Sequence, residues 1–354
     1  MPSSATGWPA RSARLATSLA DQQPPAGIAP ARPRPSFRHR LEYLAVVSAV
    51  SFVRLLPMRG VLAVGTLLGR AFYTVDRGHR QLAMQNLRAA FPGRTEEECQ
   101  SICRDMFSHF GRLLVVLLKF STMRPEAMLS RVEFEGEERV IHAHAQNRGV
   151  LLYTGHFGFW EINALVHALT LKPMAVLARP LDNPLLHDLL ETVRTATGNS
   201  VFYRRGAIRR VLRALEANQA VAFLIDQHMQ PADAVYVDFF NRPAATTSAL
   251  AALALRTGAP VVPVFALPLP GGRFRMVYEH AVEPPNPEAD HAITEFTQRC
   301  TDVLEMYVRR YPELWLWMHR RWRDVPAGEH VKGMFPAASN EPADATDDVE
   351  ERTQ

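Results

Sequence analysis

The sequence predicts an α/β fold in which a mixed, mostly parallel sheet is flanked by helices and preceded by a helical, membrane-associated segment. One observation is the alternation of short apolar runs with amphipathic stretches between residues 149 and 267. Another is a pair of longer apolar runs between residues 41 and 75, where this alternation is absent. The third is that hydrophobic residues make up 47% of the 354 residues, which is enough for a large core.

Residues 1–36 form a basic stretch that is rich in Pro, Ala, Ser and Arg. They lack apolar periodicity, so we expect a disordered tail, and no apolar stretch of a secretory signal follows the first charges. The first 40 residues contain six arginines and one aspartate. A basic segment ahead of an apolar one favours an anionic membrane surface as partner. The chain shows no nucleic-acid recognition motif, so we do not expect nucleic acid as a partner.

Residues 37–120 are expected to form a helical, membrane-associated region. Its first part consists of two apolar runs that Arg54, Pro57 and Arg59 separate. Each run is shorter than the about 20 residues that span a bilayer, so we expect helices that lie in the membrane or insert part of the way. A single tilted span would bury two arginines at high cost. The alternative is a buried helical hairpin in a soluble domain.

Residues 79–120, the second part of this region, have apolar residues at helical spacing. One helix is expected to stop at Pro92 and Gly93. The next is expected to begin after Thr95, which forms a capping-box pattern with Glu98.

Three cysteines are present, Cys99, Cys103 and Cys300. Cys99 and Cys103 lie one helical turn apart, but no second Cys or His pair completes a zinc site. We therefore expect reduced thiols, a reducing cytoplasmic compartment and no bound metal.

Residues 121–326 are expected to form the α/β domain. Short buried strands are expected at residues 149–155, 173–179, 220–226 and 260–267. Helices are expected at residues 158–171, 183–198, 206–218 and 244–257. This order is typical of βαβ units with a mainly parallel sheet. Residues 327–354 are poor in apolar residues and end in an acidic run, so we expect a disordered acidic tail.

Polar side chains stand at the ends of several predicted strands. His156 follows the first of these strands, Arg179 ends the second, and Asp226 and Gln227 lie at the end of the third. Ligands of open α/β sheets bind at the carboxyl ends of the strands, so these side chains are the first candidates for a site.

His156 and Glu161 stand five residues apart in the stretch LLYTGHFGFWE. On one continuous helix this spacing would place them on different faces. They converge if His156 lies in the turn before a helix and Glu161 in its first turns, where free N–H groups also favour an anion. Such a pair is suited to general-base catalysis. The alternative is an exposed loop histidine and a glutamate that stabilises the helix N-terminus.

The sequence lacks the motifs of several enzyme classes. No G-x-S-x-G nucleophile elbow is present, and neither a P-loop nor a dinucleotide-binding fingerprint follows a strand. Without an activated nucleophile of the protein, a histidine base would act on a group that the substrate brings. A substrate hydroxyl that attacks an acyl thioester fits this requirement, with nearby donors stabilising the oxyanion.

Five segments of the chain resemble, in order, segments of the bacterial lipid A biosynthesis acyltransferases, the lauroyl and myristoyl transferase type within the lysophospholipid acyltransferase superfamily. The segments are GVLLYTGHFGFWE, LARPLDNPLLHDLLETVR, VAFLIDQHM, VDFFNRPAATTSALAALALRTGAPVVPVF and YPELWLWMHRRW. The resemblance covers residues 40–325 and implies a glycerolipid acyltransferase-like fold. It implies transfer of a fatty acyl group from acyl carrier protein or coenzyme A to a hydroxyl of a lipid A precursor-like glycolipid. The implied place is the cytoplasmic face of the inner membrane, and no cofactor beyond the acyl thioester is implied.

By this resemblance His156 is the catalytic base and Glu161 its partner, with Asp226 as a second orienting carboxylate. Arg179 would bind a phosphate or the oxyanion. Four further residues are expected to bind substrate, namely Asn183, Gln227, Phe159 and Arg204. Phe159 stands where the family often has Asn, which bears on the acceptor lipid. Two other hypotheses remain open: an acyltransferase for another membrane phospholipid, glycolipid or aminolipid, and a non-catalytic membrane-associated lipid-binding protein.

Two further groups have open interpretations. The arginines at positions 204, 205, 209, 210 and 213 would meet an acidic carrier protein, a coenzyme A phosphate or a lipid headgroup, or they form a solvated helix face. The tryptophan-rich segment 315–322 lies either at a membrane interface or in the core.

Overall fold

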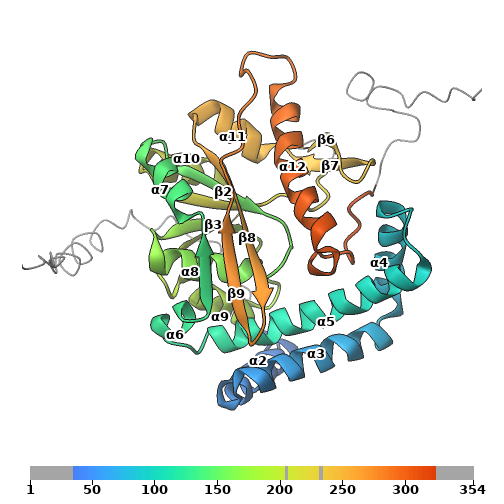
Figure 1. Cartoon of the computed structure of the whole chain (residues 1–354). Coiled ribbons are helices and arrows are strands. Elements are labelled where there is room, and N and C mark those ends of the chain that lie inside the picture. The colour runs from blue at the N-terminus through green and yellow to red at the C-terminus, as the bar shows by residue number, and fades with distance from the viewer. Residues whose placement is uncertain (1–34, 204–205, 231–233, 324–354) are drawn as a thin grey trace, which may run out of the picture.

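The computed structural model describes residues 35–203, 206–230 and 234–323 (Figure 1). The predicted basic tail, apart from Pro35 and Ser36, lies outside the described residues. The predicted acidic tail and Arg204 also lie outside them.

A seven-stranded sheet forms the centre of the fold (Figure 1). The strand order is β1-β9-β8-β2-β5-β3-β4, and every neighbouring pair is parallel except the antiparallel pair β8–β9. The strands are β1 (Val132–Glu135), β2 (Val150–Thr154), β3 (Met174–Ala178), β4 (Ser200–Tyr203), β5 (Ala220–Leu224), β8 (Val261–Leu269) and β9 (Arg273–Tyr278). The mixed, mostly parallel sheet that the sequence predicts is confirmed.

A small antiparallel hairpin of β6 (Ala234–Asp238) and β7 (Pro243–Thr247) lies apart from this sheet. It corrects the helix predicted at residues 244–257, of which only α11 (Ala249–Thr257) is helical. The alanines of this stretch favour a helix, but Arg321 donates hydrogen bonds to the Ala245 carbonyl and to Thr246 Oγ1 and holds the stretch extended. Tertiary contacts override the local propensity here.

Helices cover both faces of the sheet and enclose two cores. One core contains Leu151 and Tyr153 of β2, and the other contains Val150 and Leu152, because successive strand residues point to opposite faces. The helices of the first core include α10 (Ala207–Glu216), α11 and α12 (Ala292–Arg310), and two N-terminal helices described below also contribute to it. Those of the second are α7 (Glu137–Ala145) and α8 (Trp160–Thr170), and α9 (Pro184–Thr195) lies next to α8. Two short helices complete this part, α6 (Pro125–Leu129) and the 3-10 helix Pro312–Leu314.

The N-terminal region consists of α2 (Phe37–Leu55), α3 (Met58–Val75), α4 (Arg77–Ala90) and α5 (Glu96–Phe120). Figure 1 shows α2, α3 and α5 running beneath the lower end of the sheet. The two apolar runs that Arg54, Pro57 and Arg59 separate in the sequence form α2 and α3, and Pro57 is the N-cap of α3. The capping box of Thr95 and Glu98 at the start of α5 is confirmed as well.

Glycines bring the backbones of α3 and α5 into direct contact. A Cβ atom on Gly69 would lie 2.1 Å from the Phe107 carbonyl oxygen, and one on Gly111 would lie 2.2 Å from the Gly65 carbonyl oxygen. Since no side chain fits in this space, the crossing of α3 over α5 requires glycine at these positions.

Within the described residues, no helix is both long and apolar enough to cross a bilayer. In the part of the chain that the structure describes, α2 and α3 carry more than half of the large apolar side chains that are exposed. We call this set the apolar surface of α2 and α3; it consists of Phe37, Leu41, Leu44, Phe52, Leu55, Leu67, Leu68, Phe72 and Val75.

Candidate active site

The loop between β2 and α8 carries His156 and is held by backbone contacts. The Gly158 N–H donates to the Leu314 carbonyl at 2.9 Å, and the Phe159 N–H donates to the Ala266 carbonyl at 3.0 Å. Gly158 has a φ of +57°, and a Cβ atom there would lie 2.1 Å from the Ala266 oxygen. Glycine is therefore required two residues after His156, and the turn has little freedom.

His156 is bonded to Asp226, which follows β5, the strand next to β2. The Nδ1 atom of His156 lies 2.8 Å from Asp226 Oδ1, and the backbone N–H of His156 donates to Oδ2 at 2.6 Å. The indole N–H of Trp315 donates to the same Oδ2 at 2.8 Å. Asp226 is only 4% exposed, and these donors compensate a charge that would otherwise be costly to bury. Because Nδ1–H donates to the carboxylate, Nε2 is left as the basic nitrogen.

Burial and charge act in opposite directions on the pKa values of this pair. Burial alone lowers the pKa of His156, but the charge and hydrogen bond of Asp226, together with the charge of Glu161, outweigh it and raise the pKa above 6.5. Burial raises the pKa of Asp226, but the charge of His156 and hydrogen bonds from His156 and Trp315 lower it to about 2. Asp226 is therefore ionised at neutral pH and stabilises the charged form of His156.

The Nε2 atom of His156 is the open side of this pair. Exposed Gln227 places its side-chain nitrogen 3.2 Å from it, where the amide N–H can donate. The ring of Trp160 lies 5.2 Å from the imidazole, centroid to centroid. The His156 side chain is 16% exposed, so a substrate group can reach the ring from the surface.

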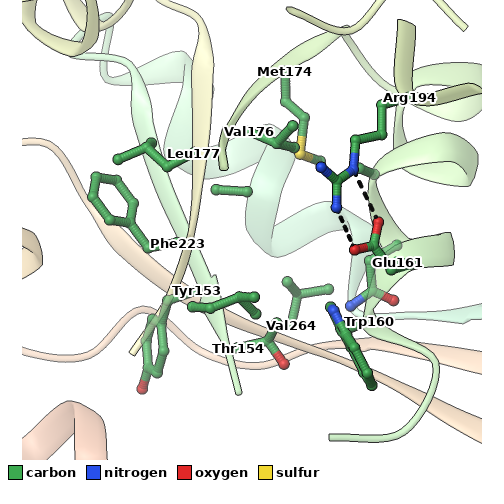
Figure 2. A pocket seen from close by; sticks show the side chains of 14 residues that line it. Tyr153, Thr154, Trp160, Glu161, Met174, Val176, Leu177, Arg194, Phe223 and Val264 are labelled. Atoms are coloured by element: carbon green, nitrogen blue, oxygen red, sulfur yellow. Dashed lines mark hydrogen bonds and ion pairs between the residues drawn. The ribbon is translucent and has the colours of Figure 1, made fainter. Parts of the chain in front are cut away.

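Glu161, in the first turn of α8, is paired with Arg194 of α9 (Figure 2). The Arg194 Nη2 atom lies 2.5 Å from Oε1, and Nε lies 3.2 Å from Oε2. The sequence analysis predicts Glu161 as the direct partner of His156. In the structure, the carboxylate that is hydrogen-bonded to His156 is instead that of Asp226. The physical reason is that the loop turns His156 towards β5, while α8 carries Glu161 towards α9. Glu161 still acts on His156 through its charge.

A cavity of about 70 Å³ lies beside this ion pair, between α8 and the strands β2, β3 and β5 (Figure 2). Trp160 and the ion-paired Glu161 and Arg194 are among the residues that line it. Most of the wall is apolar and includes Met174, Val176, Leu177, Ala222, Phe223 and Val264. Two polar residues, Thr154 and Asn163, also line it.

The other predicted substrate residues have different surroundings. Arg179 is exposed just beyond β3, at the same edge of the sheet as His156. Phe159 is 1% exposed and packs against the ring of Phe274 at 4.5 Å, so its side chain belongs to the core. Asn183 is 6% exposed and serves the fold, because it caps α9 and donates to the His39 carbonyl of α2 at 2.9 Å. Trp315 and Trp317 are also buried, which decides for the core interpretation of these two residues.

Two residues near the site carried no signal in the sequence. Arg194 pairs with Glu161 across 33 positions of the chain. His109 of α5 is fully buried, and burial lowers its pKa to about 3, so it is neutral. Its Nε2 atom lies 3.1 Å from the Gly158 carbonyl and donates to it, which ties α5 to the loop of His156. No local pattern relates either residue to its partner, because both contacts depend on the tertiary fold.

Among the described residues, one group could offer several ligand atoms to a metal. His187, Asp188 and Glu191 on α9 have such atoms within 4.8 Å of one another. His187 Nε2 lies 3.5 Å from Glu191 Oε2, and the imidazole packs against the ring of Tyr203. These contacts already account for the arrangement, and the absence of a required metal stays a prediction.

A family model and several known proteins match most of this chain. The family model described as bacterial lipid A biosynthesis acyltransferase matches residues 32–324. The lipid A biosynthesis myristoyltransferase of Escherichia coli (strain K12) is 26% identical over 300 residues, which are 83% of this chain and 91% of that protein. The lipid A biosynthesis lauroyltransferase of the same strain is 28% identical over 277 residues, which are 77% of this chain and 88% of that protein. A lipid A biosynthesis acyltransferase of Haemophilus influenzae is 25% identical over 257 residues, 71% of this chain and 78% of that protein.

Proposed function

Since the chain belongs to the bacterial lipid A biosynthesis acyltransferase family, we propose that this acyltransferase moves a fatty acyl group from a thioester to a hydroxyl of a lipid A precursor-like glycolipid. The donor is the thioester of acyl carrier protein or of coenzyme A. The observation that carries the proposal is the hydrogen bond between His156 Nδ1 and the buried Asp226 carboxylate, which leaves Nε2 as a base at the surface.

In the proposed reaction His156 Nε2 takes the proton of the acceptor hydroxyl. The hydroxyl oxygen forms a bond to the thioester carbonyl carbon, and an oxyanion results. When the carbonyl forms again, the carbon–sulfur bond breaks and the sulfur leaves with the proton from Nε2. The products are an ester and a free thiol, and His156 is neutral again.

Asp226 and Gln227 have different roles in this proposal. The Asp226 carboxylate fixes the tautomer and stabilises the imidazolium ion after proton transfer. The Gln227 amide is 3.2 Å from Nε2, the position that the incoming hydroxyl needs. The hydroxyl would take the place of this amide donor.

Glu161 and Arg179 would assist the reaction without taking part in the proton transfer. Glu161 contributes negative charge that favours imidazolium, and its pairing with Arg194 fixes it at the wall of the cavity. Arg179 lies at the end of β3, and one strand, β5, separates β3 from β2. The ends of β3 and β2 are therefore about 10 Å apart. An arginine at this distance suits a phosphate of the acceptor or donor.

We also propose that the protein lies on an anionic membrane surface through the apolar surface of α2 and α3. Phe37, Leu41 and Leu44 are spaced so that they share one face of α2, and Arg38 and Arg40 lie beside them. This arrangement supports binding to an anionic membrane surface, and the location that we propose is the cytoplasmic face of the inner membrane. Replacing Phe37, Leu41 and Leu44 together by Ser should weaken binding to vesicles with anionic lipid at least about tenfold. Serine at exposed Ile293 and Met306 is the matched control.

The test of the enzymatic proposal is a transfer assay with the full chain. The protein is incubated with a lipid A precursor that has a free hydroxyl and with a labelled acyl thioester. We expect the mass of the precursor to rise by one acyl group and a thiol to appear, with the rate lowered at least about 10²-fold in His156→Ala. Transfer to a phospholipid in place of the precursor would favour the other acceptor class. Binding of the lipid without transfer would overturn the proposal in favour of a lipid-binding protein.

A further inference from the structure

Three buried polar atoms in the cavity beside α8 have no hydrogen-bond partner among the described residues. They are Thr154 Oγ1, Asn163 Nδ2 and Asn163 Oδ1. Thr154 is 6% exposed and Asn163 is 4% exposed, so bulk water does not satisfy them freely. Unpaired polar atoms are costly to bury and are rare in folded proteins. Their presence in a cavity therefore indicates a ligand group that pairs with them.

The rest of the cavity limits the chemistry of that group. Apart from the ion pair of Glu161 and Arg194, whose charges compensate each other, the remaining wall is largely apolar. A charged ligand group would lose its hydration without gaining an opposite charge. A hydroxyl group fits, because it can accept from Asn163 Nδ2 and donate to Asn163 Oδ1 or Thr154 Oγ1.

The cavity borders the loop that carries His156. Thr154 is the last residue of β2 and precedes His156 by two positions. Trp160, which also lines the cavity, packs against the His156 ring with 5.2 Å between the ring centroids. A donor whose carbonyl carbon lies near His156 Nε2 would therefore place its first few carbons beside Thr154 and Asn163.

From these observations we propose that the cavity binds an acyl chain that carries a hydroxyl group within a few carbons of the thioester carbonyl, and that Thr154 and Asn163 recognise this hydroxyl. The inference rests on the proposed acyl transfer and names the class of its donor. A plain hydrocarbon chain would cover the same polar atoms without pairing them, which disfavours it as a donor.

Water is the competing occupant. The cavity of about 70 Å³ exceeds the roughly 10–15 Å³ that one water needs on the same measure. A water that pairs with Thr154 and Asn163 and stays in place would give no preference for a hydroxylated chain. The two occupants therefore differ in the specificity of the enzyme.

The experiment compares thioesters of equal chain length that are unsubstituted, 2-hydroxylated or 3-hydroxylated. For the wild-type protein we expect kcat/KM at least about tenfold higher with one of the hydroxylated chains. Thr154→Val and Asn163→Leu should each lower this preference at least about fivefold, whereas Thr154→Ser should keep it. Val176→Ile is the matched control, because it narrows the cavity without changing its hydrogen-bonding groups and should affect all donors alike.

Equal rates of the wild-type protein with all three donors would overturn the inference, as would an unchanged preference in both Thr154→Val and Asn163→Leu. In either case transfer from the unsubstituted chain continues, so the proposed function stands. If none of the thioesters serves as donor, the proposed function fails and the inference fails with it. Thermal unfolding of each variant shows whether it is folded. If Asn163→Leu does not fold, the isosteric Thr154→Val keeps the test decisive.

Discussion

Replacing Asp226 by Asn removes one charge from the site with almost no change in shape. The wild-type carboxylate accepts from His156 Nδ1 at 2.8 Å, from the His156 backbone N–H at 2.6 Å and from Trp315 Nε1 at 2.8 Å. An amide has one acceptor oxygen, so it cannot accept both from His156 Nδ1 and from the pair formed by the His156 backbone N–H and Trp315 Nε1. With the amide nitrogen towards Nδ1, the imidazole takes the other tautomer, and the proton on Nε2 prevents it from acting as a base.

The magnitude follows from the tautomer that Asp226 fixes. Although burial acts to raise it, the pKa of Asp226 is lowered by the charge of His156 and by hydrogen bonds from His156 and Trp315, so the ionised form is stabilised in the site. In the Ser-His-Asp triad of serine proteases the same change, with its wrong tautomer, lowers kcat about 10⁴-fold. We expect kcat for Asp226→Asn to fall by about 10²- to 10⁴-fold.

The pH dependence gives an independent check. A histidine base works when it is neutral, so the rate of the wild-type protein should rise with pH through the pKa of His156, which lies above 6.5. Without Asp226, burial dominates and lowers this pKa. The rise of the remaining activity in Asp226→Asn should therefore move to lower pH. A wild-type rate and an unchanged profile in this variant would refute the role of Asp226.

Stability should depend on pH through the same two groups. The folded pKa of Asp226 is depressed, so its contribution is present above pH 3.8 and is lost as the pH falls through about 2. The folded pKa of His156 is raised, so its contribution is present below pH 6.5 and is lost as the pH rises through the folded value. Urea unfolding across this range should show both losses in the wild-type protein. Neither should appear in Asp226→Asn, while Asp238→Asn, a half-buried carboxylate outside the site, should keep them.

Three further predictions concern packing and pairing around the site. Glu161→Gln and Arg194→Met should be non-additive by about 1 kcal/mol in a double-mutant cycle of unfolding free energies, because each side chain is 20% exposed and the pair is bidentate; additivity would mean that the pair contributes nothing. Gly69→Ala should destabilise the protein by about 1–3 kcal/mol, since its Cβ would lie 2.1 Å from the backbone of α5, whereas Gly60→Ala in the same helix meets only contacts of 3.6 Å or longer and should be neutral or stabilising in thermal unfolding. Asn183→Ala should cost about 1–2 kcal/mol in urea unfolding, because it removes the cap of α9 and the link to α2; a smaller loss than for an exposed Asn→Ala change would contradict this.

The part of the fold that the sequence predicts is the part with strong local patterns. The strands β2, β3, β5 and β8 carry continuous apolar runs between turn residues, as buried parallel strands do. The strands β1 and β4 have only four residues each, and β9 alternates between exposed and buried residues at its start. Such short or half-exposed strands give too weak a signal in the sequence to separate them from loops.

The site was predictable where the chain itself brings residues to a strand end. His156 and Gln227 follow from that rule, and so does the presence of Asp226 at the same edge. What the sequence does not contain is the register. Thr154 of β2 lies opposite Leu224 of β5, an offset of 70 residues that continues to His156 and Asp226. The neighbour of β2 is chosen by the packing of the whole sheet, so this pairing has no local signal.

The two carboxylates near His156, those of Asp226 and Glu161, have different surroundings because different elements carry them, and we expect them to act differently. Asp226 follows a strand hydrogen-bonded to β2, so the backbone fixes its distance to the ring, and it can set the tautomer. Glu161 lies in the first turn of α8, where Arg194 holds it at the wall of the cavity. A group held there influences both the charge on His156 and the shape of the cavity that we propose for the acyl chain. Loss of Glu161 should therefore change the KM for the acyl donor together with kcat, whereas loss of Asp226 should act mainly on kcat.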